Sequence, residues 1–110
     1  MTLFAVETSC DETSVALVRD GHVLANLVSS QVRLHSEYGG VVPELATREH
    51  LRNFLPIARA ALETGGVQPS EIDAVAATQG PGLPSALLIG FHAAQTLAYV
   101  WQLPFLGIHH

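Results

Sequence analysis

The chain has 110 residues, of which 48% are hydrophobic, and its formal net charge is −5 at pH 7. It contains five arginines and no lysine, so it offers no basic patch for binding nucleic acid on its own. Its N-terminus lacks the basic and long apolar regions of a secretory signal. The single cysteine, Cys10, cannot form an internal disulfide, so we expect a reducing, cytoplasmic compartment. Cys10 is also a candidate nucleophile, although no histidine stands beside it in the sequence.

The first apolar run, Leu3–Val6, stops at the polar segment Glu7–Thr13, and a second apolar run follows at Val15–Val18. Such a segment between two strands is either a polar turn or a loop that holds phosphate or a metal. It contains two adjacent acids, Asp11 and Glu12. Because buried carboxylates are unfavourable unless they are paired or bind a ligand, this acidic turn is the first candidate site.

Two further strands are predicted at Ser14–Arg19 and His22–Val28, separated by Asp20-Gly21. Asp-Gly between apolar runs is typical of a type I′ hairpin turn, which needs positive φ at both positions. Together with a first strand at Leu3–Glu7, they predict a three-stranded antiparallel meander.

A polar connection over residues 29–42 leads to the first predicted helix, which begins at Pro43 because proline suits the first helical turn. Gly65-Gly66 ends this helix. Pro56 removes one internal hydrogen bond, so we expect a kink or a break near Asn53.

The sequence then predicts a fourth strand at Ile72–Thr78, a second helix from Pro84 to about Trp101 and a fifth strand at Leu103–Ile108. The order β-β-β-α-β-α-β indicates an α/β fold with a mixed sheet. We expect strands one, four and five to be parallel and helices to cover both faces of the sheet.

Ligands of open α/β sheets bind beyond the carboxyl ends of the strands. Those ends are Thr8–Glu12, Thr78–Gly82 and His109–His110, and we expect them to converge. The turn Gly80, Pro81, Gly82 precedes a helix, whose N-terminus presents free N–H groups to anions. It is therefore either an ordinary turn or the second wall of a nucleotide pocket.

All fifteen charged residues lie between Glu7 and Asp73, so Ala74–His110 carries no formal charge. A transmembrane helix is one interpretation, but two prolines and several polar residues interrupt the apolar run and no charged residues flank it. The simpler interpretation is a helix and strands within a larger core. A third is a face that another lobe or a partner covers.

The histidines raise the question of a metal. His35 and His50 flank a Gly-Gly-Val-Val-Pro-Glu segment and are either surface residues, a helix-face residue in the case of His50, or residues that shape the site. His109 and His110 are adjacent on a strand and point to opposite faces, so at most one of them serves a given metal. A metal site needs three or more ligands, so at least one comes from outside these residues or there is no metal.

Several motifs extend over the whole chain in a fixed order. They are Glu7–Thr13, Ser30–Gln31, His35–Ala46, Arg48–His50, Gly80–Leu83, Ala86–Gly90 and Ile108–His110. Together they resemble the TsaD family of tRNA N6-adenosine threonylcarbamoyltransferases, formerly described as glycoproteases. The resemblance implies that residues 1–110 form the N-terminal lobe of an actin-like (RNase H-like) ATPase fold, with the second lobe absent.

The resemblance also implies a reaction. The threonylcarbamoyl group passes from threonylcarbamoyl-adenylate to the anticodon-adjacent adenosine of tRNAs that read codons beginning with A. Asp11 and Glu12 are the implied catalytic residues, which position the substrate or the incoming amine or act as a base. The implied substrate pocket is lined by Thr8, Ser9, Gly80, Pro81 and Gly82.

One divalent metal is implied as well, iron with zinc as the alternative, held by a His-x-x-x-His pair and a distant Asp. His110 matches the first histidine, and the second would fall beyond the sequence, so we expect this chain alone to be inactive. The implied partners are tRNA, a TsaB-like paralogue and a TsaE-like ATPase, with no membrane.

Two alternatives stay open: a non-catalytic partner subunit of the same complex, and an actin-like small-molecule kinase. A metallopeptidase is disfavoured because the chain has no His-Glu-x-x-His motif. We also expect the isolated chain to self-associate through its charge-free half.

Overall fold

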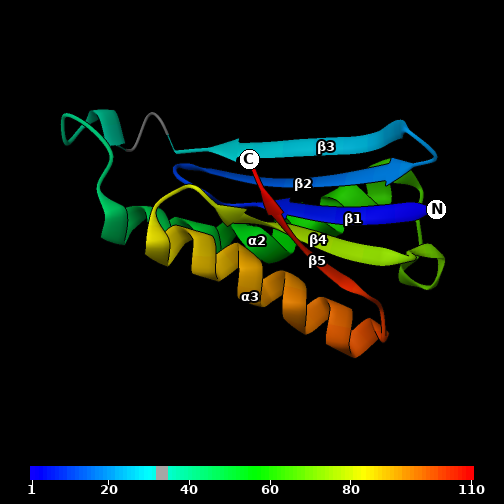
Figure 1. The fold of residues 1–110 in the computed structure, drawn as a ribbon. Coiled ribbons are helices and arrows are strands. Elements are labelled where there is room, and N and C mark those ends of the chain that lie inside the picture. The colour runs from blue at the N-terminus through cyan, green and yellow to red at the C-terminus, as the bar shows by residue number, and fades with distance from the viewer. Residues whose placement is uncertain (32–34) are drawn as a thin grey trace.

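Five strands form one sheet in the order β3-β2-β1-β4-β5 (Figure 1). The structure is a computed structural model and describes residues 1–31 and 35–110. Residues 32–34 of the predicted polar connection lie outside the described residues. The strands are β1 (Thr2–Glu7), β2 (Glu12–Arg19), β3 (His22–Ser30), β4 (Ala74–Gly80) and β5 (Phe105–His109).

The strand directions confirm the predicted mixed sheet. β1 to β3 form an antiparallel meander, whereas β1 is parallel to β4 and β4 is parallel to β5. Asp20 and Gly21 have φ values of 50° and 82°, as a type I′ turn requires. β4 begins two residues later than predicted, because a short 3₁₀ turn, Pro69–Glu71, leads into it.

The two described helices begin where proline predicted. They are α2 (Pro43–Gly65) and α3 (Pro84–Trp101), and Gly66 closes α2 in the left-handed conformation with φ 65°. Of the kink or break predicted near Asn53, the break is wrong, since α2 continues through Pro56. Pro56 lies on the exposed side of α2, where water can satisfy the carbonyl group that the proline leaves unpaired.

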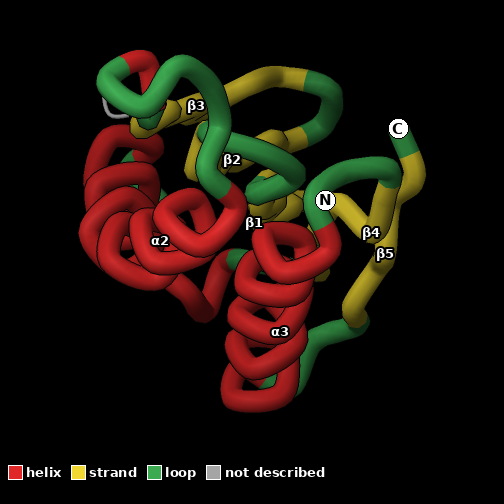
Figure 2. Tube along the Cα trace, turned by 90° about the vertical axis from the view of Figure 1, so that its left-hand side faces the viewer, coloured by secondary structure: helices red, strands yellow, loops and turns green. Residues whose placement is uncertain are grey.

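Both described helices cover the same face of the sheet, which corrects the prediction of helices on both faces (Figure 2). The reason is topological. β3 is parallel to β4, and the β3-α2-β4 and β4-α3-β5 connections both step toward the β5 edge. Right-handed crossovers that step in one direction place their helices on one face. The core between them contains Phe4, Val6, Val15, Leu17, Phe54, Ala58, Ala94 and Ala98.

Residues of the charge-free half divide between this core and the surface. Small side chains at Ala86, Gly90, Ala94 and Ala98 form the buried side of α3, whereas Tyr99 on its other side is 86% exposed. No helix among the described residues is long and apolar enough to cross a membrane.

Candidate functional site

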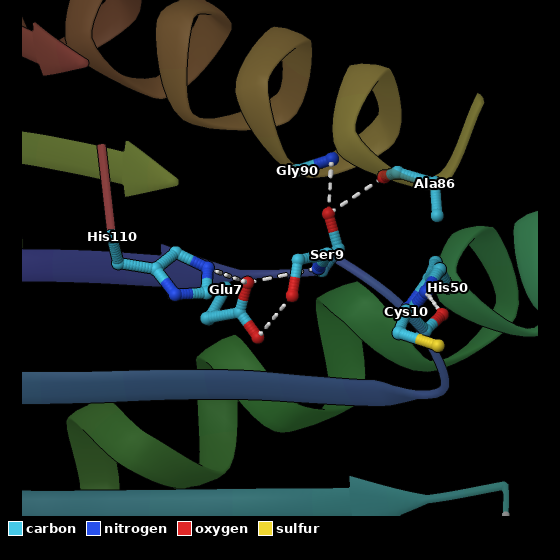
Figure 3. Close-up of polar contacts among 8 residues, drawn as sticks. Glu7, Ser9, Cys10, His50, Ala86, Gly90 and His110 are labelled. Carbon is cyan, nitrogen blue, oxygen red and sulfur yellow. Dashed lines mark hydrogen bonds and ion pairs between the residues drawn. The ribbon is translucent and has the colours of Figure 1, made fainter. Parts of the chain in front are cut away.

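The carboxyl ends of β1, β4 and β5 meet at one edge of the sheet, as predicted. The amide of Leu83, at the start of α3, donates to the carbonyl oxygen of Ser9 at 2.7 Å. The amide of His110 donates to the carbonyl oxygen of Gly80 at 2.9 Å. His110 Nε2 also lies 3.8 Å from Glu7 Oε1 (Figure 3). The acidic turn, the Gly80–Gly82 turn and the C-terminal histidines are therefore neighbours.

Thr8 fixes the acidic turn to α3. Its side chain is 2% exposed, and its Oγ1 donates to the carbonyl oxygen of Ala86 at 2.7 Å and accepts from the amide of Gly90 at 3.0 Å. A Cβ added at Gly90 would overlap this hydroxyl. Thr8 therefore lies behind the site, and its hydroxyl is already engaged by the helix.

Ser9 and Gly82 bring the two turns into direct contact. A Cβ added at Gly82 would lie 2.5 Å from the carbonyl oxygen of Ser9, so only glycine permits this approach. The Ser9 hydroxyl and amide donate to the Glu7 carboxylate at 3.0 Å and 2.8 Å. The sequence did not single out Glu7 as a site residue, although an acid at the end of a buried strand is a usable signal.

The adjacent acids Asp11 and Glu12 have different surroundings. The half-buried Asp11 side chain borders a cavity of about 440 Å³, whose other lining residues belong to the segment 35–41. The Asp11 carbonyl oxygen accepts from the amide of Gln31 at 2.8 Å. Glu12 is exposed at the first position of β2. One carboxylate thus borders a cavity and the other faces solvent.

His50 is fully buried beneath the acidic turn. Its Nε2 lies 2.7 Å from the Cys10 carbonyl oxygen and its Nδ1 lies 2.8 Å from Thr13 Oγ1 (Figure 3 draws the Cys10 contact). A carbonyl oxygen only accepts, so Nε2 carries the hydrogen and Nδ1 of the neutral ring accepts from the Thr13 hydroxyl. Burial lowers the pKa of His50 from its ordinary value, and the bond to Cys10 opposes this shift.

His35 is also buried, and it holds the glycine segment in place. Its Nε2 donates to Gln31 Oε1 at 2.7 Å, and its Nδ1 accepts from the Val42 amide at 3.1 Å. The Gln31 amide group donates to the Ala46 carbonyl oxygen at 3.3 Å, which defines the orientation of this side chain. Neither His35 nor His50 is a surface residue, and both shape the loops around the acidic turn.

The surroundings of Cys10 do not favour a nucleophile. Burial, followed by the negative charge of Asp11, raises the pKa of the Cys10 thiol. Since the thiolate is the reactive form, Cys10 lacks the electropositive setting of a reactive cysteine.

The described residues do not complete a metal site. Among them, no group of three or more His, Cys, Asp or Glu side chains lies close enough to hold an ion. His110 is about half exposed, and Glu7 is the acidic group beside it. His110 as a ligand therefore stays a prediction that requires donors from elsewhere.

A separate apolar groove runs between the outer sides of α2 and α3. Its cavity volume is about 500 Å³. Three leucines on its rim, Leu51, Leu55 and Leu88, are more than half exposed. The remaining lining residues are Phe54, Ile89, His92, Ala93, Thr96 and Leu97.

The chain is similar to proteins of one family. The family model described as TsaD, tRNA N6-adenosine threonylcarbamoyltransferase, matches residues 22–110. Proteins named tRNA N6-adenosine threonylcarbamoyltransferase from Thermomicrobium roseum and Trichlorobacter lovleyi are 53% and 54% identical over 111 residues. Each alignment covers 100% of this chain but 30% and 32% of the relative, so the chain spans about a third of their length.

Among solved structures, YeaZ from Pseudomonas aeruginosa superposes with a TM-score of 0.76 at 31% identity. The superposition covers 98% of this chain and 43% of YeaZ. The predicted actin-like α/β class is thereby confirmed.

Proposed function

The chain belongs to the TsaD family of tRNA N6-adenosine threonylcarbamoyltransferases, and we propose the following reaction for the full-length protein that contains it. The protein transfers the threonylcarbamoyl group of threonylcarbamoyl-adenylate to N6 of the anticodon-adjacent adenosine in tRNAs that read codons beginning with A. The observation that carries this proposal is the meeting of the acidic turn, the Gly80–Gly82 turn and His110 at one edge of the sheet.

We assign one turn to the adenylate phosphate and the other to the incoming amine. The Gly80–Gly82 turn leads into the N-terminus of α3, where the helix dipole favours a phosphate, so we assign the adenylate phosphate to this side. The proposed phosphate pocket is lined by Ser9, Gly80, Pro81 and Gly82. Thr8 lies behind it and fixes the acidic turn to α3.

The acidic pair faces the incoming amine. The adenosine N6 attacks the carbonyl carbon of the threonylcarbamoyl group, the N–C bond forms, the C–O bond to the phosphate breaks and AMP leaves. The attacking nitrogen loses one proton, which the exposed Glu12 carboxylate accepts. Asp11, at the rim of the cavity, accepts a hydrogen bond from the amine and orients it.

We also propose that His110 is one ligand of a divalent metal, iron or zinc, whose other ligands lie outside these 110 residues. When bound, this metal would orient and polarise the threonylcarbamoyl group. The chemistry assigned above to Asp11 and Glu12 does not depend on it.

The partners follow from charge and shape. Because the chain has a net charge of −5, we propose that most tRNA contacts come from the rest of the protein or from its partners. These partners are cytoplasmic and include a TsaE-like ATPase. For the groove between α2 and α3 we propose one occupant, the matching helices of a TsaB-like paralogue. The superposition on YeaZ supports this choice, because it shows that a related protein carries the same fold and hence a similar helix pair.

Two other functions are weaker. The first is a non-catalytic partner subunit. Against it, the identity to the named transferases is 53–54%. The chain also retains Asp11-Glu12 and His109-His110, which a partner subunit does not need. A small-molecule kinase of the same fold would instead consume ATP.

The test is reconstitution of the full-length protein with its TsaB-like and TsaE-like partners, preformed threonylcarbamoyl-adenylate and unmodified tRNA. Mass spectrometry of the tRNA nucleosides should show threonylcarbamoyladenosine, with one AMP released per modified tRNA. ATP-dependent phosphorylation of a small molecule, or peptide cleavage, without tRNA modification would refute the proposal.

A further inference from the structure

We propose that His50 is a positioning residue that holds the Asp11–Glu12 pair in place for transfer. This inference rests on the proposed function. The imidazole contacts the residue before the pair and the residue after it, through the Cys10 carbonyl oxygen at 2.7 Å and Thr13 Oγ1 at 2.8 Å. A single imidazole on α2 therefore forms hydrogen bonds at both ends of the two-acid segment.

A third hydrogen bond holds the same segment. The backbone amide of Gln31 donates to the Asp11 carbonyl oxygen at 2.8 Å, and His35 orients the Gln31 side chain. None of these bonds uses a carboxylate, so the segment is held through its backbone and Thr13, while the Asp11 side chain borders the cavity and Glu12 is exposed. Transfer rates depend steeply on such placement, because a displacement of about 1 Å can reduce the rate by about 100-fold.

The chemistry of the ring explains why a histidine stands here. The Cys10 carbonyl requires a donor and the Thr13 hydroxyl is matched by an acceptor. The contact with Thr13 is buried and the contact with Cys10 is partly buried. A neutral imidazole offers a donor on one nitrogen and an acceptor on the other. A leucine of similar size would fill the space but leave both polar groups unsatisfied, and buried polar groups without partners are strongly disfavoured.

The experiment compares His50→Gln with His50→Leu in the full-length protein and its partners. The amide N–H of glutamine reaches about as far as Nε2 and can renew the bond to Cys10. We expect His50→Leu to lower kcat by about 100-fold without raising KM. His50→Gln should retain at least about a tenth of the wild-type kcat. His22→Gln, on the exposed hairpin, is the matched control and should leave both constants unchanged.

A second readout does not require activity. With ¹⁵N-labelled histidine, the NMR shifts should identify a neutral His50 ring protonated on Nε2. The backbone amide signals of Asp11 and Glu12 should move in His50→Leu and stay near their wild-type positions in His50→Gln. If the wild type transfers nothing, the proposed function fails, and these signals still decide whether His50 positions the pair.

The positioning role is overturned if folded His50→Leu keeps the wild-type kcat, or if His50→Gln and His50→Leu lose it equally. Unchanged Asp11 and Glu12 amide signals in His50→Leu would overturn it as well. If His50→Leu does not fold, Thr13→Val and Thr13→Ser replace the pair. Valine keeps the shape of threonine without the hydroxyl and should lower kcat, whereas serine should preserve it, and equal rates would refute the role.

Discussion

Replacing Gly90 by alanine tests the fixation of the acidic turn to α3. In an exposed helix interior this change stabilises a protein by about 1 kcal/mol. At Gly90 the new Cβ would overlap Thr8 Oγ1 and lie 3.0 Å from Thr8 Cγ2. Thr8 is buried and held by two hydrogen bonds, so it cannot move aside freely. Overpacking and a weakened hydrogen bond outweigh the gain, and we expect a net loss of about 2 kcal/mol.

The assay is thermal unfolding of the full-length protein, in which this loss should lower Tm by about 3 °C. Gln95→Ala, at an exposed position of the same helix, is the control and should change stability by less than about 0.5 kcal/mol.

A double-mutant cycle isolates the contact. In a Thr8→Ala background the hydroxyl is gone, so Gly90→Ala should become neutral or stabilising by up to about 1 kcal/mol. Destabilisation of equal size in both backgrounds, or stabilisation of the wild type, would refute the proposed contact.

Three further predictions concern the turn, the pH dependence and the groove. Gly82→Ala places a Cβ 2.5 Å from the Ser9 carbonyl oxygen, so it should displace the turn and lower the transfer rate by about 100-fold in a kinetic assay. The pKa of His50 is lower in the native state than its ordinary 6.5, so the unfolded chain binds more protons below that pH. Stability measured by denaturation should therefore fall as pH drops from 6.5 toward the lowered pKa, and His50→Gln should remove this part of the slope. Leu55→Glu should abolish self-association of the isolated chain in light scattering and weaken binding of the TsaB-like partner, unlike Val23→Glu on the hairpin. A monodisperse wild-type monomer would contradict the groove's role.

Local signals predicted most of the fold because they act within a few residues. Asp20-Gly21 fixed the hairpin turn, and Pro43 and Pro84 marked the first turns of the two described helices. The face that the helices cover was predicted wrongly. It depends on the order of the strands across the sheet, and no single residue indicates that order.

The candidate site was predictable in outline and not in its contacts. The carboxyl ends of the parallel strands identified the edge where Ser9, Gly80, Gly82 and His110 meet. The sequence could not assign Thr8 to the back of the site, because its partners lie 78 and 82 residues away on α3. The same holds for His50, whose bonds to Thr13 and Cys10 join residues 37 and 40 positions apart.

We propose that the carboxylates of the acidic turn carry out the transfer. The most direct measurement is the single-turnover rate of tRNA modification by Glu12→Gln and Asp11→Asn in the reconstituted full-length system. Glu63→Gln, an exposed acid on α2, is the charge-matched control. Loss of one carboxylate should slow transfer by about 100-fold or more, while the control keeps the wild-type rate. Wild-type rates in both site variants would contradict the account.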